Sequence, residues 1–192
     1  MSIDSHLERI HAFGRVNDES TSSRSSKMLN ITRSTGAFLD LLITDAKPKR
    51  ILELGTSNGY STIWLARAAN LVGAHVDSVD VSLQKTSLAS ANLTQCELRD
   101  VVTLHTADCA DFLRGCDSLT YDFAFLDSDR GSYCELIADL LRVIRFGLLV
   151  VDNAISHQQE LAEFKRRLLD DHQLTVAVLP IGNGQMIVHG GG

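Results

Sequence analysis

The chain lacks the features typical of exported, membrane-embedded or nucleic-acid-binding proteins. Its 192 residues include no run of 18 apolar residues and no apolar N-terminal segment of signal-peptide length, so we expect neither a membrane span nor export. The net charge is -6, and no cluster of Lys and Arg reverses it locally, which disfavours a nucleic-acid surface. The four cysteines form no Cys-x-x-Cys pair, so we expect small buried side chains in a reducing cytoplasm.

Hydrophobic residues make up 44% of the sequence, which is enough for one well-cored domain and makes a second one unlikely. We therefore predict a single domain over residues 1–192, with N-terminal helices and a lid in 1–48 and a ligand-binding core in 49–192. No internal repeat is visible. The polar, serine-rich segment 17–26 follows a short N-terminal helix. We expect it to be mobile and to form the lid together with residues 27–31.

Strand-like and helix-like patterns alternate after a helix that Thr32 or Ser34 caps and that Pro48 ends. The strand-like runs are residues 50–54, 76–81, 101–105, 121–126 and 147–152. This alternation predicts an α/β fold with a mostly parallel sheet and helices on both faces. Residues 175–179 and 186–189 flank a Gly-Asn-Gly loop and predict a hairpin, so the last strand should be antiparallel to its neighbour.

The most informative stretch joins the strand 50–54 to a mostly buried helix, 61–71, through a turn bracketed by Gly55 and Gly59. Glycine allows a positive φ and leaves room for a ligand beside the backbone, and a helix start offers unpaired N–H groups. These features predict a nucleotide-cofactor loop. Its spacing is Glu-x-Gly-x-x-x-Gly, which differs from the Gly-x-Gly-x-x-Gly of dinucleotide enzymes.

Four acidic residues stand at the ends of predicted strands, namely Glu53, Asp80, Asp127 and Asp152. Ligands of such sheets collect beyond the carboxyl ends of the strands. Asp80 lies 25 residues after Gly55, near the offset at which an acidic side chain binds ribose hydroxyls, and this supports an adenosyl cofactor. Each residue taken singly is equally compatible with a helix N-cap, but four on one edge favour a ligand site.

Asp127, Asp152 and Asn153 follow two strands that should be neighbours, about 5 Å apart. Two uncompensated carboxylates at this distance would repel each other, and one would tend to protonate. Because these oxygen ligands suit a hard divalent cation such as Mg²⁺, we favour a metal site over a bare pair. His157 follows on the same edge, where a capping or surface role is more common than a ligand role.

In order and spacing, these motifs resemble those of the cation-dependent O-methyltransferases, which include the catechol and caffeoyl-CoA enzymes and their bacterial relatives. The resemblance covers about residues 27–189 and rests on Glu53-x-Gly55-x-x-x-Gly59-Tyr60-Ser61, Val79-Asp80, residues 125–133 and residues 147–153. It implies a Rossmann-like, seven-stranded methyltransferase sheet.

The resemblance also implies roles for individual residues. The implied S-adenosylmethionine contacts are Glu53, Gly55, Ser57, Gly59, Ser61 and Asp80, with Asp80 on the ribose and with Asp108 and Cys109 near the adenine. Asp127, Asp152 and Asn153 match the family's ligands of a divalent cation. The implied partner is a small-molecule hydroxyl acceptor, and neither nucleic acid nor membrane is expected. The oligomeric state stays open, with a homodimer as one alternative.

One position departs from the family pattern. Arg130 stands three residues after Asp127, where the family usually has the Lys that takes the proton of the substrate hydroxyl. Arginine stays protonated, so we expect Arg130 to stabilise a phenolate electrostatically beside the catalytic Asp127. The alternative is a surface residue paired with Asp129 or Asp111.

The sequence therefore predicts an enzyme that moves a methyl group from S-adenosylmethionine to a hydroxyl held on a divalent cation. One alternative is a noncatalytic or non-O-methylating S-adenosylmethionine-binding protein, which Arg130 favours. The other is a nicotinamide-dependent oxidoreductase, which explains the sheet and Asp80 but requires the absent Gly-x-Gly-x-x-Gly turn.

Overall fold

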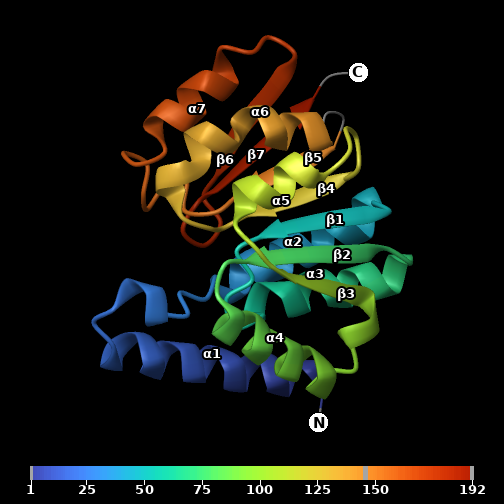
Figure 1. Cartoon of the computed structure of the whole chain (residues 1–192), viewed down its shortest axis with the longest axis vertical. Helices are drawn as coiled ribbons and strands as arrows, with labels where there is room; N and C mark the ends of the chain where they lie inside the picture. The colour runs from blue at the N-terminus through green and yellow to red at the C-terminus, as the bar shows by residue number, and fades with distance from the viewer. Residues whose placement is uncertain (1, 145–146, 191–192) are drawn as a thin grey trace.

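The computed structural model describes residues 2–144 and 147–190 (Figure 1), so residues 1, 145–146 and 191–192 of the predicted domain lie outside the described residues. The helices are α1 (Ile3–Ser20), α2 (Arg33–Ala46), α3 (Tyr60–Val72), α4 (Leu83–Gln95), α5 (Cys109–Gly115), α6 (Tyr133–Ile144) and α7 (Ala162–Leu169). The strands are β1 (Arg50–Leu54), β2 (His75–Asp80), β3 (Val102–Thr106), β4 (Phe123–Leu126), β5 (Leu148–Val151), β6 (Leu174–Leu179) and β7 (Gln185–Gly190). Three short 3-10 turns cover Arg24–Ser26, Arg99–Val101 and Arg130–Ser132.

The strands form one seven-stranded sheet in the order β3-β2-β1-β4-β5-β7-β6. Neighbours among β1 to β5 run parallel, whereas β7 is antiparallel to both β5 and β6. The predicted α/β fold and the antiparallel last strand are therefore confirmed. The crossover from β3 to β4 moves the chain to the other side of β1, and this change of direction creates the ligand-binding crevice of such sheets.

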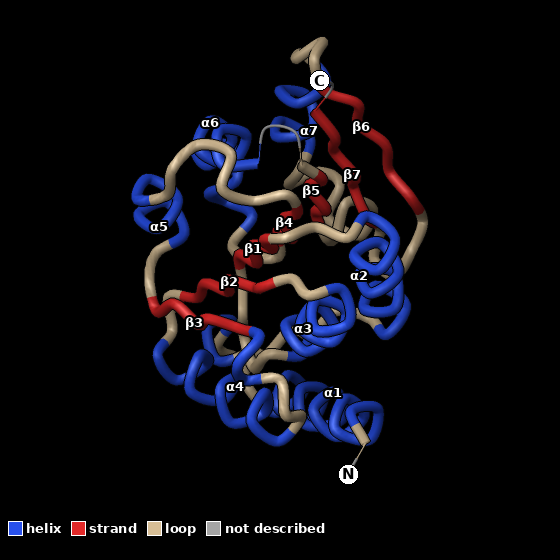
Figure 2. The backbone as a smooth tube through the Cα atoms, turned by 90° about the vertical axis from the view of Figure 1, so that its right-hand side faces the viewer, coloured by secondary structure: helices blue, strands red, loops and turns tan. Residues whose placement is uncertain are grey.

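Helices cover both faces of the sheet, with α2 and α3 on one side and α5 and α6 on the other (Figure 2). The strand period of two explains how each strand serves both layers. In β4, Phe123 and Phe125 pack into the core beneath α1, α2 and α3, while Ala124 and Leu126 pack into the core beneath α5, α6 and α7. Strands buried on both faces read as continuous apolar runs, which is why the sequence predicts them well.

The structure corrects three details of the sequence analysis. The serine-rich segment 17–26 does not begin after the N-terminal helix, because α1 continues through the first four residues of the segment and Arg24–Ser26 forms a 3-10 turn. The predicted strand 50–54 coincides with β1, and the bounds of the other predicted strands differ from the observed ones by at most two residues. Of the four free cysteines, only Cys96 is buried, and the other three are partly buried at the margin of the core beneath α5, α6 and α7. Among the described helices, none has the length and apolar character that a membrane span requires.

Candidate active site

The carboxyl ends of β1, β4 and β5 bring the predicted acidic residues together at one edge of the sheet. The register pairs Leu54 with Leu126 and Leu126 with Val151. The backbone N–H of Asp127 donates to Leu54 O at 2.9 Å, and that of Asp152 donates to Leu126 O at 3.2 Å. The predicted adjacency of these two aspartates is therefore present in the fold.

The glycine turn has the positive φ angles that its sequence predicts, 109° at Gly55 and 84° at Gly59. The expected positive φ is therefore confirmed, whereas the expected room for a ligand is not what lies in the Cβ direction of these two glycines. A Cβ on Gly55 would collide with the backbone carbonyl of Asp127, and a Cβ on Gly59 would lie 2.9 Å from the Cβ of Ala89. The protein's own chain, rather than open space for a ligand, fills the volume beside both glycines.

Glu53 is fully buried at the base of this turn. Its carboxylate accepts hydrogen bonds from Ser61 Oγ at 2.5 Å, Thr62 Oγ1 at 2.6 Å and Ser78 Oγ at 2.5 Å. Burial raises the pKa of Glu53 to about 7, although the three hydroxyls oppose that rise. Glu53 thus ties β1 to the start of α3 and to β2, and Ser61 is engaged in the same network.

Asp80 organises the backbone of the glycine turn. Its two carboxylate oxygens accept the N–H groups of Ser57 and Ser82, each at 2.9 Å. Each oxygen keeps a further lone pair, so Asp80 can accept more hydrogen bonds while it holds the turn. The side chain of Ser57 donates in turn to Met28 O at 2.7 Å.

This contact fastens the predicted lid segment 27–31 to the turn. Asp18, near the end of α1, accepts the N–H groups of Met28 at 2.6 Å and Leu29 at 2.8 Å. The segment therefore crosses the site edge between two polar anchors, Asp18 and Ser57.

Asp108 and Cys109 lie at the start of α5, after β3. Asp108 caps this helix, because its Oδ1 accepts the N–H groups of Ala110 and Asp111. Burial raises the pKa of the Cys109 thiol to about 11, and the negative charge of Asp108 adds to this effect. Cys109 is therefore a neutral thiol at physiological pH.

Asp127 and Asp152 form an electrostatically strained pair. Burial, the charge of Asp152 and the charge of Glu53 raise the pKa of Asp127 well above its ordinary value. Burial also raises the pKa of Asp152, against the hydrogen bond that it accepts from Gln185 Nε2. Residues 2–144 and 147–190 contain no group of three or more His, Cys, Asp or Glu side chains placed for a metal ion. The predicted set contains only two such side chains, because its third member is an amide.

That amide belongs to Asn153, which is buried and has a φ of 64°. Its Nδ2 donates to Asp152 Oδ2 at 2.9 Å, and its Oδ1 accepts from Arg130 Nη1 at 2.9 Å. Arg130 Nε donates to Glu160 Oε2 at 2.8 Å, and only 8% of the Arg130 side chain is exposed. The alternative of a surface residue paired with Asp129 or Asp111 is therefore wrong.

Sequence reasoning missed two residues of this network, Gln185 and Glu160. Gln185 is buried at the start of β7 and donates to Asp152 and to Thr35 Oγ1. Because Val151 pairs with Met186 in the antiparallel register, the predicted hairpin could have placed Gln185 opposite Asp152. Nothing in the sequence marks Glu160, because the loop that carries it has no regular period. His157 lies in the same loop, and its Nδ1 shares a hydrogen bond with Ser156 Oγ.

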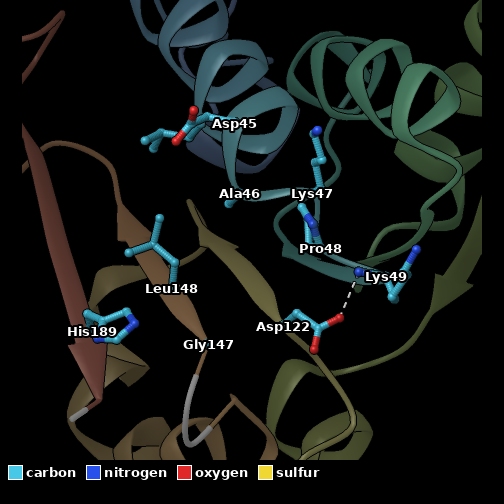
Figure 3. A pocket seen from close by; sticks show the side chains of 10 residues that line it. Asp45, Ala46, Lys47, Pro48, Lys49, Asp122, Gly147, Leu148 and His189 are labelled. Atoms are coloured by element: carbon cyan, nitrogen blue, oxygen red, sulfur yellow. Dashed lines mark hydrogen bonds between the residues drawn. The ribbon is translucent and has the colours of Figure 1, made fainter. Parts of the chain in front are cut away.

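The hollow drawn in Figure 3 lies away from the acidic residues described above. Its volume is about 500 Å³, and its lining includes Pro48, Lys49, Asp122, Gly147 and His189. Asp122 accepts the N–H of Lys49 there at 2.7 Å (Figure 3). Pro48, Lys49, Asp122 and Gly147 precede β1, β4 and β5, and His189 of β7 pairs with Leu148 at the start of β5. This hollow and the acidic edge therefore occupy opposite ends of the sheet.

Comparison with known proteins identifies the class. The chain belongs to the O-methyltransferase family, whose family model matches residues 11–190. This result confirms the family resemblance that the motifs predicted.

Two curated relatives are named catechol O-methyltransferase. The chain is 33% identical to that of Niastella koreensis over 139 residues, which cover 70% of this chain and 62% of the relative. It is 33% identical to that of Mycobacterium tuberculosis over 134 residues, which cover 69% of this chain and 60% of the relative. The matched part therefore spans about three fifths of each relative.

Solved structures support the fold. An SAH-bound methyltransferase of Podospora anserina aligns with a TM-score of 0.82 at 18% identity, over 99% of this chain and 88% of that chain. An O-methyltransferase of Bacillus cereus in complex with SAH aligns with a TM-score of 0.79 at 21% identity, over 97% of this chain and 90% of that chain.

Proposed function

We propose that this protein transfers the methyl group of S-adenosylmethionine to a hydroxyl of a catechol-like small molecule, with a divalent cation at Asp127, Asp152 and Asn153. The observation that carries the proposal is the convergence of buried Asp152 and Asn153 with half-buried Asp127 and with Arg130 beside the glycine turn. The names of the two curated relatives support this acceptor class. The SAH-bound structural neighbours support the cofactor.

The glycine turn and Asp80 fit an adenosyl cofactor. Asp80 has lone pairs free for ribose hydroxyls after it has accepted the N–H groups of Ser57 and Ser82. Asn58 Nδ2 in the same turn is buried without a hydrogen-bond partner in the described part of the chain, and a polar ligand commonly satisfies such a group. Glu53 and Ser61 support the turn from below, and Asp108 and Cys109 flank the proposed adenine position.

The donor set also fits a hard cation. Asp127 and Asp152 present carboxylate oxygens that repel each other, and Asn153 carries an amide oxygen that accepts from Arg130 Nη1 in this structure. A divalent cation bound there would supply positive charge that lowers the pKa of an acceptor hydroxyl. Arg130 cannot remove the proton, because its guanidinium stays charged, and it adds a second positive charge beside the acceptor.

The reaction is then an in-line displacement. Bound S-adenosylmethionine would supply the methyl group: the acceptor oxygen would bond to the methyl carbon as the bond from that carbon to the sulfonium sulfur breaks, and the hydroxyl proton would leave to solvent. Positioning of the two reactants and exclusion of water supply most of the acceleration. Asp18 and Ser57, which hold segment 27–31 over the turn, keep water out in this scheme.

We further propose that the protein acts in the cytoplasm as a single domain, without nucleic-acid or membrane partners. The four free cysteines are consistent with a reducing compartment.

The test is methyl transfer to catechol, with and without excess chelator, for the wild type, Asp152→Ala and the exposed control Asp117→Ala. We expect turnover that stops with chelator and returns with Mg²⁺ or Mn²⁺. Asp152→Ala should abolish turnover yet keep S-adenosylmethionine binding in calorimetry, and Asp117→Ala should match the wild type. Full transfer in chelator refutes the cation, and binding of S-adenosylmethionine without transfer to any hydroxyl acceptor favours the noncatalytic alternative. Binding of NAD instead would favour the oxidoreductase.

A further inference from the structure

Arg130 holds the same amide oxygen that the proposed cation would need. Its Nη1 donates to Asn153 Oδ1 at 2.9 Å, while the other end of that amide, Nδ2, donates to Asp152 Oδ2 at 2.9 Å. The amide oxygen is thus directed to the guanidinium, and the amide N–H is directed to the carboxylate. A cation between the carboxylates requires the opposite orientation, because it binds oxygen and not N–H.

Two features oppose a rotation of the Asn153 amide that would exchange the positions of Oδ1 and Nδ2. Asn153 is 9% exposed, so packing surrounds its side chain. After such a turn, Nδ2 would face Arg130 Nη1, and two hydrogen-bond donors would meet in a buried place without an acceptor. The amide oxygen becomes free for a cation only if Arg130 moves away from it.

Arg130 is itself firmly placed. Nε donates to Glu160 Oε2 at 2.8 Å, and the side chain is 8% exposed. Its charge also acts on both aspartates, because the guanidinium partly offsets the rise in the pKa of Asp127 and of Asp152. The guanidinium therefore performs two tasks of a bound cation, compensation of the carboxylates and capture of the amide oxygen.

We infer that Arg130 is a built-in competitor of the divalent cation, which binds only when Arg130 releases Asn153 Oδ1. This inference rests on the proposed cation site. It assigns to Arg130 the control of cation affinity in addition to the electrostatic role proposed above. A lysine at this position would keep a charge but could not hold Glu160 and Asn153 through a planar fork.

The experiment measures Mn²⁺ binding to the full chain by calorimetry and by the electron paramagnetic resonance signal of free Mn²⁺. Arg130→Met keeps the aliphatic bulk of the buried side chain and removes the charge and the fork. We expect it to bind Mn²⁺ about tenfold to a hundredfold more tightly than the wild type, the range for loss of one competing charge-assisted hydrogen bond. The Mn²⁺ affinity of Arg130→Lys should lie between those of the wild type and Arg130→Met. Arg114→Met, which changes the net charge equally at an exposed arginine paired with Asp111, should bind as the wild type does.

Asp152→Ala placed in the Arg130→Met chain locates the bound ion, and we expect it to abolish the tight binding. Equal Mn²⁺ affinity in the wild type, Arg130→Met and Arg130→Lys, lost with Asp152→Ala, overturns the inference and leaves the proposed cation site standing. Absence of Asp152-dependent binding in all chains overturns both. Arg130→Lys keeps the test decisive if Arg130→Met does not fold, because a lysine variant no tighter than the wild type also overturns the inference.

Discussion

Glu53→Gln should change how the stability of the protein depends on pH. Glu53 is fully buried, and its pKa rises from 4.5 to about 7 in the folded protein. Between these two values the folded state holds a proton that the unfolded state has lost. The stability from this proton is complete below pH 4.5 and is lost as the pH rises towards 7.

The magnitude follows from the two pKa values. Their separation corresponds to about 3 kcal/mol in total, of which about 2 to 3 kcal/mol is lost between pH 5 and pH 8. Glutamine has the same shape and cannot ionise, so Glu53→Gln lacks this loss. The free energy of unfolding of Glu53→Gln minus that of the wild type should therefore rise by about 2 to 3 kcal/mol over this range.

Urea unfolding at pH 5, 6, 7 and 8, followed by circular dichroism, measures this difference. The difference is needed because Asp127 and Asp152 also have raised pKa values, so the wild-type curve alone contains their contribution. Ser78→Ala provides a second test. The Ser78 hydroxyl stabilises the charged carboxylate of Glu53, so its loss should raise the pKa of Glu53 and move the loss of stability to higher pH. If the free energies of unfolding of Glu53→Gln and the wild type changed by the same amount from pH 5 to pH 8, the reasoning would be refuted.

Two further predictions concern the glycine turn and the ribose position. Gly55→Ala should destabilise the fold by about 3 kcal/mol or more, because its φ is 109° and its Cβ would meet the Asp127 carbonyl; thermal or urea unfolding measures this. Gly115→Ala is the matched control, because a Cβ there would have no atom within 4 Å, and it should change stability by less than about 1 kcal/mol. If Gly55→Ala and Gly115→Ala lowered the free energy of unfolding equally, the predicted clash at Gly55 would be wrong. Asp80→Ala should weaken S-adenosylmethionine binding by about 1 to 3 kcal/mol, measured by calorimetry, and an unchanged dissociation constant would remove Asp80 from the site.

The sequence alone determines the architecture of this protein. Apolar runs such as β4 are buried on both faces, so their composition identifies them as strands of a parallel sheet without further information. The carboxyl ends of parallel strands share one edge, and this rule was enough to bring Asp127 next to Asp152. The glycine turn and the Gly-Asn-Gly hairpin were readable because both demand backbone conformations that few other residues adopt.

Only the tertiary structure decided what those residues contact. The pairing of Arg130 with Glu160 and Asn153 joins positions 30 and 23 residues apart through a loop without periodicity, so no local pattern encodes it. The same holds for the close packing of Gly55 against Asp127. The predicted hairpin could have placed Gln185 opposite Asp152, but only the folded structure shows the hydrogen bond between them. Hydrophobic periodicity reports which face of an element is buried, whereas the choice of hydrogen-bond partners in a buried polar network depends on distances that exist only after the chain has folded.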